Sequence, residues 1–382
     1  MKNKKILYVC SAYPHPIDDG IKKINVNLIK EFIQQGHELT LVVPSEHNDT
    51  SEEFEKLKII KYDKKRTIWK LLRNFFLLQP LYFGFYYDSK LLKKINKDNF
   101  DLIFYDFYPL TQYSSNKKNE LFMMPDSMKQ LAWSGFRNEN GFVRKLYLFI
   151  NYLLASQYNK KICGLKKLYV SKEDMKIDLL SKSYFFKIPA DNRNFSKYQD
   201  NDFNSTELLF RGLMDFEPNI TAIKSFYNDV FIHLIEKYPK ITMKIVGKNP
   251  SNDLINSVCK NSHFTGFVDD IFDEMSQSGI HIVPMSSGTG VKTKMLDSIA
   301  LKRLVFATSK SINGIFDSIE EAKNNGVIVY ENKEEFFFYF DKIMKNELDY
   351  NLLVNKAYDF LMQNNYSNKV EELIKMAEED IN

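Results

Sequence analysis

A glycine-containing loop followed at once by two lysines carries the strongest chemical signal in this sequence. Gly288 and Gly290 stand two positions apart, and Lys292 and Lys294 open residues 291–301, whose apolar side chains recur at helical spacing. Glycine lets the backbone approach a ligand closely, and free amides at a helix N-terminus attract anions. Two ammonium groups beside such amides suit a diphosphate. The pattern predicts a phosphate-binding loop, although such turns often only connect two elements.

Asp297 follows one helical turn after the lysines. Its carboxylate can accept hydrogen bonds from a ribose diol, so phosphate at the helix tip and ribose farther along form a nucleotide-binding layout. Two alternatives remain open on the residues alone. The first is that Lys292 and Lys294 are ordinary surface lysines. The second is that Asp297 is only a charge at the N-terminus of a helix.

Two series of strands and helices position this loop. Residues 5–10 are a short apolar run, residues 21–35 have helical spacing ending at Gly36, and residues 37–43 form a second apolar run, which together predict a βαβ unit. Further strands are expected at 102–105, 121–124 and 167–170 and, after a polar linker at 185–205, at 207–210, 242–246, 280–283 and 305–307. We therefore predict an α/β fold of two Rossmann-like domains, residues 1–190 and 191–382, and leave open that the C-terminal helix crosses back to the first domain.

Composition bounds the class of protein. The chain has 382 residues, 44% of them hydrophobic, and its uncharged, aromatic-rich stretch at residues 74–87 is too short to cross a bilayer. Cys10, Cys163 and Cys259 form no paired motif, and no cluster of His, Asp and Glu has metal-ligand spacing. We expect a cytoplasmic protein that needs no metal and no other cofactor.

Charge is distributed unevenly along the chain. Residues 1–195 hold 33 Lys and Arg against 21 Asp and Glu, whereas the remainder holds 20 against 28. Residues 64–87 combine a basic start with many aromatic rings, which suits an anionic membrane surface, although core packing of the rings is equally open. The sequence has no RNP-like, zinc-finger or helix-turn-helix pattern, so we expect no nucleic-acid partner.

Four segments in the second half carry a resemblance to a known family. FRGLMDFEPNITAI, ITMKIVGKNP, FTGFVDD and GVKTKMLDSIALKRLVFAT are similar, in order and spacing, to the C-terminal domain of GT-B glycosyltransferases of family 4. YVCSAYPHPIDDG and MMPDS extend a looser similarity over the first half. The resemblance implies two Rossmann-like domains facing each other across a cleft, with an acceptor side in the first and a nucleotide-sugar donor in the second.

The resemblance also implies roles for individual residues. Lys292, Lys294 and Asp297 are expected to act in catalysis. The acceptor side is expected to include His15, Gly20 and Asp126, although Asp126 could instead cap the following helix and His15 could be structural. The residues expected to bind the donor are Gly212, Gly247, Lys248, Gly266, Phe267, Val268, Ser287, Gly288, Thr289, Gly290 and Val291.

Some positions depart from the family pattern. Thr289 and the shorter Asp297 stand where two glutamates are usual, and Leu213 and Asn219 replace an Arg and a Lys, so Lys292 and Lys294 are the expected substitutes. The implied reaction is retaining, metal-independent sugar transfer to a glycan or lipid-linked acceptor in bacterial surface polysaccharide or glycoconjugate assembly, with possible attachment to the inner face of the membrane. A nucleotide-sugar 2-epimerase and a non-catalytic GT-B partner or scaffold are the alternatives.

Overall fold

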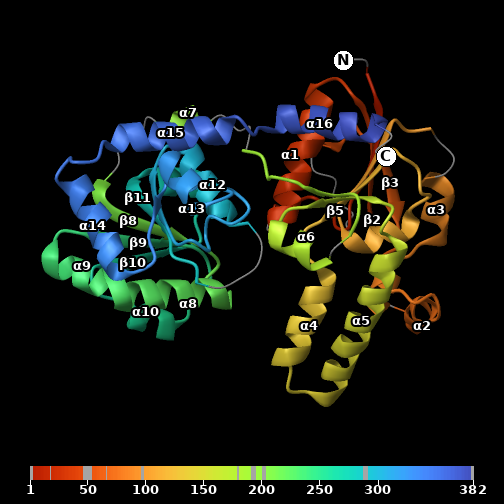
Figure 1. Ribbon diagram of the computed structural model, residues 1–382, viewed down its shortest axis with the longest axis horizontal. Coiled ribbons are helices and arrows are strands. Elements are labelled where there is room, and N and C mark those ends of the chain that lie inside the picture. Colours follow the sequence, from red (N-terminus) through yellow and green to blue (C-terminus); the bar gives the residue numbers. More distant parts are fainter. Residues whose placement is uncertain are drawn as a thin grey trace. The chain divides into compact units, whose positions relative to one another are not determined.

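The computed structural model divides the chain into two compact units (Figure 1). The first comprises Met1–Lys187 and Tyr366–Asn382, and the second Ile188–Asn365. The structure describes residues 3–17, 19–45, 54–65, 67–95, 99–178, 180–190, 195–199, 204–286 and 291–379.

A seven-stranded parallel sheet forms the centre of the first unit, in the order β3-β2-β1-β4-β5-β6-β7. Its strands are β1 (Lys5–Val9), β2 (Glu38–Pro44), β3 (Lys58–Tyr62), β4 (Leu102–Tyr105), β5 (Glu120–Met124), β6 (Lys166–Tyr169) and β7 (Ser183–Phe185). β1, β4, β5 and β6 are almost wholly buried, as strands covered by helices on both faces must be. The strand order reverses between β1 and β4.

Helices surround this sheet, and two of them extend from it. The helical elements are α1 (Gly20–Gln34), α2 (Ile68–Phe76), η2 (Leu81–Tyr86), α3 (Ser89–Ile95), η3 (Tyr108–Tyr113), α4 (Met128–Asn138), α5 (Phe142–Lys161), α6 (Lys172–Asp178) and α16 (Tyr366–Glu378). Figure 1 shows α4 and α5 as an antiparallel hairpin projecting away from the sheet. The C-terminal α16 lies against α1.

A six-stranded parallel sheet forms the second unit, in the order β10-β9-β8-β11-β12-β13. Its strands are β8 (Asn204–Arg211), β9 (Thr242–Val246), β10 (Ser262–Gly266), β11 (Ser278–Val283), β12 (Leu304–Ala307) and β13 (Ile328–Val329). The helices are α7 (Ser196–Gln199), α8 (Glu217–Phe226), the π-helical η4 (Tyr227–Phe231), α9 (Ile232–Lys237), α10 (Asn252–Ser257), α11 (Ile271–Ser276), α12 (Thr293–Ala300), α13 (Ile319–Asn324), α14 (Lys333–Met344) and α15 (Tyr350–Met362).

The α/β class and both parallel sheets agree with the sequence prediction, and several strands differ from it. Strands β3, β10 and β13 were not predicted, and β7 begins ahead of the expected linker and ends on its first residue. Within the described residues no helix is long and apolar enough to cross a membrane. Over the same described ranges, His, Cys, Asp and Glu side chains form no group of three or more that could hold a metal ion.

Candidate functional site

The second sheet has a reversal point at the carboxyl ends of β8 and β11. The chain runs from β8 through α8 to β9 on one side, and from β11 through α12 to β12 on the other. Loops that leave adjacent parallel strands in opposite directions open a crevice, which is where ligands bind in sheets of this type. The predicted phosphate loop lies between β11 and α12, so it belongs to this reversal point.

Two glycines bring the loops after β8 and β9 into close contact. The amide of Gly212 donates to the carbonyl of Val246 at 3.0 Å, and the amide of Met214 donates to the carbonyl of Lys248 at 3.1 Å. A Cβ on Gly247, whose φ is +157°, would lie 1.7 Å from the carbonyl oxygen of Gly212. Any side chain at position 247 would therefore push the two loops apart.

Lys294 points into the unit rather than into bulk water. Its Nζ donates to Oδ1 of Asn219 at 2.8 Å and lies 4.5 Å from the centre of the Phe210 ring. The ammonium group thus reaches the N-terminal turn of α8, where Asn219 stands in place of the family's lysine. Burial, and to a lesser degree the charges of Arg211 and Lys292, lower the pKa of Lys294 to about 7.

Lys292 stands immediately before α12 and is only 9% exposed. The alternative in which both lysines are ordinary surface residues is therefore wrong. The helix itself begins at Thr293, two residues later than predicted, and the amide of Thr293 donates to the carbonyl of Val291 at 3.0 Å. Val291 therefore precedes the helix instead of opening it. Ser287, Gly288, Thr289 and Gly290 lie outside the described residues.

Asp297 is 2% exposed and forms an ion pair with Nη1 of Arg211. It lies in the middle of α12, so it is not an N-terminal helix charge. Sequence reasoning placed this carboxylate toward a ribose, whereas the structure shows it joined to a guanidinium group. Arg211, which sequence reasoning did not single out, ends the apolar strand β8. That position was the available signal, because strand ends at a reversal point line the crevice.

The loop after β10 contributes exposed and open positions. Phe267 is 74% exposed, Lys248 is exposed and Val268 is half-buried. Gly266 has a φ of +71°, and no atom lies within 4 Å of the Cβ position. The loop follows β10, which is the edge strand of the sheet next to β9. The exposed ring of Phe267 is therefore accessible to a flat ligand.

Charge at the reversal point favours an anion. Arg211, Lys292 and Lys294 are close enough for the charges of the first two to lower the pKa of the third. Asp297 pairs with Arg211 within this group. Cations held close together and partly away from water attract anions, of which a diphosphate is one.

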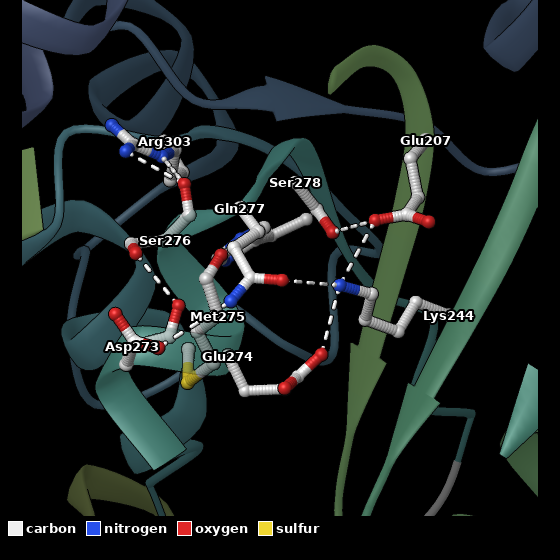
Figure 2. Close-up of polar contacts among 10 residues, drawn as sticks. Glu207, Lys244, Asp273, Glu274, Met275, Ser276, Gln277, Ser278 and Arg303 are labelled. Carbon is white, nitrogen blue, oxygen red and sulfur yellow. Dashed lines mark hydrogen bonds and ion pairs between the residues drawn. The ribbon is translucent and has the colours of Figure 1, made fainter. Parts of the chain in front are cut away.

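Buried charges at the opposite end of the same sheet are instead paired with one another. Figure 2 shows Nζ of Lys244 between Glu207, Glu274 and Gln277, at 3.3, 2.9 and 3.2 Å from their oxygens. Ser278 Oγ donates to the Glu207 carboxylate at 2.6 Å. The three donor positions of this ammonium are therefore used internally, so we interpret the network as structural.

The predicted acceptor-side residues lie in the first unit. Gly20 is exposed at the first position of α1, and His15 packs against Phe54 with the ring centres 5.2 Å apart. Asp126 is half-buried after β5. Ser127, not Asp126, caps α4, because its side chain accepts from the amide of Gln130 at 3.3 Å. The capping alternative for Asp126 is therefore wrong.

Sequence reasoning missed a buried carboxylate at the reversal point of the first sheet. Asp106, which follows β4 and is 1% exposed, accepts from the amide of Ser11 at 2.7 Å and from Nδ2 of Asn25 at 2.7 Å. Burial raises the pKa of Asp106 to about 7. These bonds tie the end of β1 to α1, so Asp106 positions the loop that leads to Gly20.

A cavity of about 480 Å³ lies beside the α4–α5 hairpin. Two cations, Lys129 and Arg137, and two rings, Trp133 and Tyr152, are among its lining residues. α4 starts two residues after Asp126, so this cavity belongs to the same part of the first unit as the predicted acceptor residue.

Comparisons with known proteins agree with this description. Residues 205–346 match the family model described as "Glycosyl transferases group 1". A Klebsiella pneumoniae protein described as "Uncharacterized 44.6 kDa protein in cps region" is 25% identical over 393 residues, which cover 96% of this chain and 97% of that protein.

Two solved structures illustrate the likeness of fold. "Trehalose-6-phosphate from E. coli bound with UDP-2-fluoro glucose" aligns with a TM-score of 0.63 and 11% identity over 98% of this chain and 99% of that one. WaaG, "a glycosyltransferase involved in lipopolysaccharide biosynthesis", aligns with a TM-score of 0.61 and 12% identity over 97% and 99%. The fold is therefore the GT-B fold, whereas membership of family 4 stays a prediction.

Proposed function

We propose that this chain, which has a group 1 glycosyltransferase domain and the GT-B fold, transfers a sugar from a nucleotide-sugar donor to a glycan or lipid-linked acceptor. The observation that carries the donor site is the group of three cations and one carboxylate at the β8–β11 reversal point. A nucleoside diphosphate is an anion, which cations gathered at one place attract. In the structural relative bound to UDP-2-fluoro glucose the ligand is itself a nucleotide sugar.

The same cations suit the chemistry of transfer. When the glycosidic bond of a nucleotide sugar breaks, negative charge develops on the diphosphate that leaves. Lys292 and Lys294 can stabilise that charge where other enzymes use a metal ion, so we propose a metal-independent reaction. Retention of the anomeric configuration is proposed from the family resemblance.

Asp297 and Arg211 act together in this proposal. The buried carboxylate holds the guanidinium group at the end of β8, which keeps Arg211 beside Lys294. Asp297 is then a positioning residue rather than the ribose acceptor that the sequence suggested.

Calorimetric titration with a panel of nucleoside diphosphates tests the donor site. We expect one of them to bind at micromolar concentration, and binding to weaken at least about tenfold in Lys292→Ala/Lys294→Ala, because two charge-assisted contacts are lost. Lys240→Ala/Lys356→Ala, which removes two exposed lysines elsewhere in the second unit, is the matched control. Failure of every diphosphate to bind would favour the non-catalytic partner over the enzyme.

Incubation with the matching nucleotide sugar in the presence of a chelator tests the reaction class. Release of the free diphosphate is expected for transfer or for slow hydrolysis. An epimerase would instead change the sugar and leave the diphosphate attached. Loss of all turnover on chelation would show that a metal is required.

The proposed function extends to the acceptor and to the cellular location. We propose an acceptor that is part of a bacterial surface polysaccharide or glycoconjugate under assembly, which fits the description of the Klebsiella relative as a protein in a cps region. We propose a cytoplasmic enzyme attached peripherally to the inner face of the cell membrane, with the acceptor side in the first unit.

A further inference from the structure

The exposed rings of the first unit fall into two groups. Within residues 64–87, whose role the sequence left open between core and membrane, Phe83 is fully buried but Trp69 and Phe76 on α2 are 81% and 79% exposed. Phe142 and Val143 at the start of α5 are each 81% exposed. A soluble surface rarely leaves such large apolar side chains together without a partner.

On α5 these exposed side chains form a stripe. Phe142, Leu146, Phe149 and Leu153 recur every three or four residues, and their exposed fractions are 81%, 48%, 36% and 47%. Asn151, which is buried and accepts from the amide of Leu81, lies on the opposite side of the helix. The stripe therefore faces away from the core of the unit, along the projecting hairpin seen in Figure 1.

The charge of these helices has one sign. None of the residues of α2, α4 and α5 is Asp or Glu, although 49 of the 382 residues in the chain are acidic. The hairpin helices carry six cations: Lys129, Arg137, Arg144, Lys145, Lys160 and Lys161. The turn between them holds a single acid, Glu139, whose carboxylate accepts from Nε of Arg144 at 3.0 Å.

We propose that the α4–α5 hairpin docks on an anionic lipid bilayer, with the α5 stripe of Phe142, Leu146, Phe149 and Leu153 in the acyl boundary and its cations at the phosphate level. An exposed apolar stripe on helices that carry cations and no acidic residue suits such an interface. The exposed apolar side of α2 supplies a second contact in the same unit. The proposal deepens the proposed function, because a lipid-linked acceptor resides in a bilayer.

Charge also argues against a second copy of the chain as the occupant. A two-fold interface brings the same patch of both subunits together, so the cations of one hairpin would face those of the other. Anionic headgroups compensate these charges instead. The cavity lined by Lys129 and Arg137 lies on the same hairpin and would accept a lipid phosphate.

Vesicle flotation of the full-length protein tests the proposal without requiring sugar transfer. We expect the protein to float with vesicles of phosphatidylcholine and phosphatidylglycerol and to remain below vesicles of phosphatidylcholine alone. In Phe142→Asp/Leu146→Asp the partition coefficient should fall at least about tenfold, because two apolar side chains leave the acyl boundary. The control Phe338→Asp/Leu352→Asp changes two exposed apolar residues of the second unit, 54% and 53% exposed, and should float like the wild type.

Charge reversal provides the second arm. Arg144→Glu/Lys145→Glu should weaken binding at least about tenfold, since two charges that the anionic surface attracts become two that it repels. Lys240→Glu/Lys356→Glu makes the same change of net charge in the second unit and should leave binding intact. Thermal unfolding of each variant establishes that it is folded.

Intrinsic fluorescence gives an independent reading, because the only two tryptophans, Trp69 and Trp133, lie on α2 and α4. Their emission should shift to the blue with anionic vesicles and be quenched by brominated acyl chains.

Absence of the wild type from the floated fraction, or equal binding by the hairpin variants and the wild type, would overturn the proposal. So would a dimer in sedimentation equilibrium that the Phe142→Asp/Leu146→Asp change converts to a monomer. Nucleotide binding is measured separately, so loss of membrane docking and loss of the donor site are distinguishable.

Discussion

At the scale of single residues, the candidate donor site depends on the ammonium group of Lys294, whose charged form is destabilised by its surroundings. Lys294 is partly withdrawn from water and lies near two other cations, which lower its pKa to about 7. Its Nζ donates to Asn219 Oδ1, a neutral oxygen, at 2.8 Å and lies 3.9 Å from the sulfur of Met285. Such a group gains more from a phosphate oxygen than an exposed lysine does, because it has already lost most of its hydration.

Nucleotide binding should therefore depend on pH through Lys294. Above about pH 7 the ammonium group loses its proton in the free protein, so affinity for a nucleoside diphosphate should fall by up to about tenfold per pH unit. Lys294→Arg should bind with little change over the same range, because guanidinium stays charged. Isothermal titration at a series of pH values provides the measurement. An equal pH profile in both proteins would remove Lys294 from the site.

His281 should make the second unit sensitive to acid. It is 1% exposed, its Nδ1 lies 2.7 Å from Ser298 Oγ, and burial lowers its pKa to about 3 from 6.5. Between these two pH values the unfolded chain binds a proton that the folded chain does not, so stability falls as pH falls. The slope should be at most about 1.4 kcal/mol per pH unit.

Urea unfolding at several pH values, followed in His281→Gln, checks this linkage. The variant should lose that contribution to the slope, whereas His263→Gln, at an exposed position, should keep it. An unchanged slope in His281→Gln would assign the acid sensitivity to other groups.

At the scale of elements, the sequence was informative where periodicity was strong. Most of the predicted strands agree with the structure within a few residues, and the helix expected at residues 291–301 exists as α12. β13 was missed because it has only two residues, and β10, whose side chains are only partly buried, lacks an apolar run. β3, with the sequence KIIKY, lies at one edge of its sheet, and its two lysines made it resemble a surface segment.

The candidate site was predictable only in part, for a related reason. Lys292 and Lys294 were found because glycines precede them in the chain. The pairing of Arg211 with Asp297 joins residues on β8 and α12, and only the strand order β8-β11 brings those elements together. Asp106 was missed in the same way, because Ser11 and Asn25 meet it across the β1–β4 reversal.

Of the two glycines in the loops that border the donor site, Gly247 should matter more for stability than Gly266. Gly247→Ala should destabilise the protein by about 3 kcal/mol or more, because the added carbon would overlap the carbonyl of Gly212. Gly266→Ala meets no atom and should cost only about 1 kcal/mol for its positive φ. Urea unfolding of both variants measures the difference. Equal losses would mean that the loops after β8 and β9 separate without cost.

At the scale of the whole molecule, the last helix belongs to the unit in which the chain begins. Tyr366, Val370 and Leu373 on α16 are fully or almost fully buried. Nζ of Lys166, on β6, donates to the carbonyl of Glu379 at 2.9 Å, and Nε2 of Gln35 donates to Oγ of Ser367 at 3.1 Å. α16 therefore completes the first unit, although the segment before it, through α15, belongs to the second.

Removal of residues 366–382 should consequently unfold the first unit and spare the second. The apolar surface that α16 covers is worth several kcal/mol, which is comparable with the whole stability of a domain. In calorimetry the truncated chain should lose one unfolding transition while keeping the other, and it should still bind a nucleoside diphosphate, because Arg211, Lys292 and Lys294 lie in the second unit. A chain that keeps both transitions would show that α16 adds little to the first unit. One that loses nucleotide binding as well would show that the donor site needs the first unit to be folded.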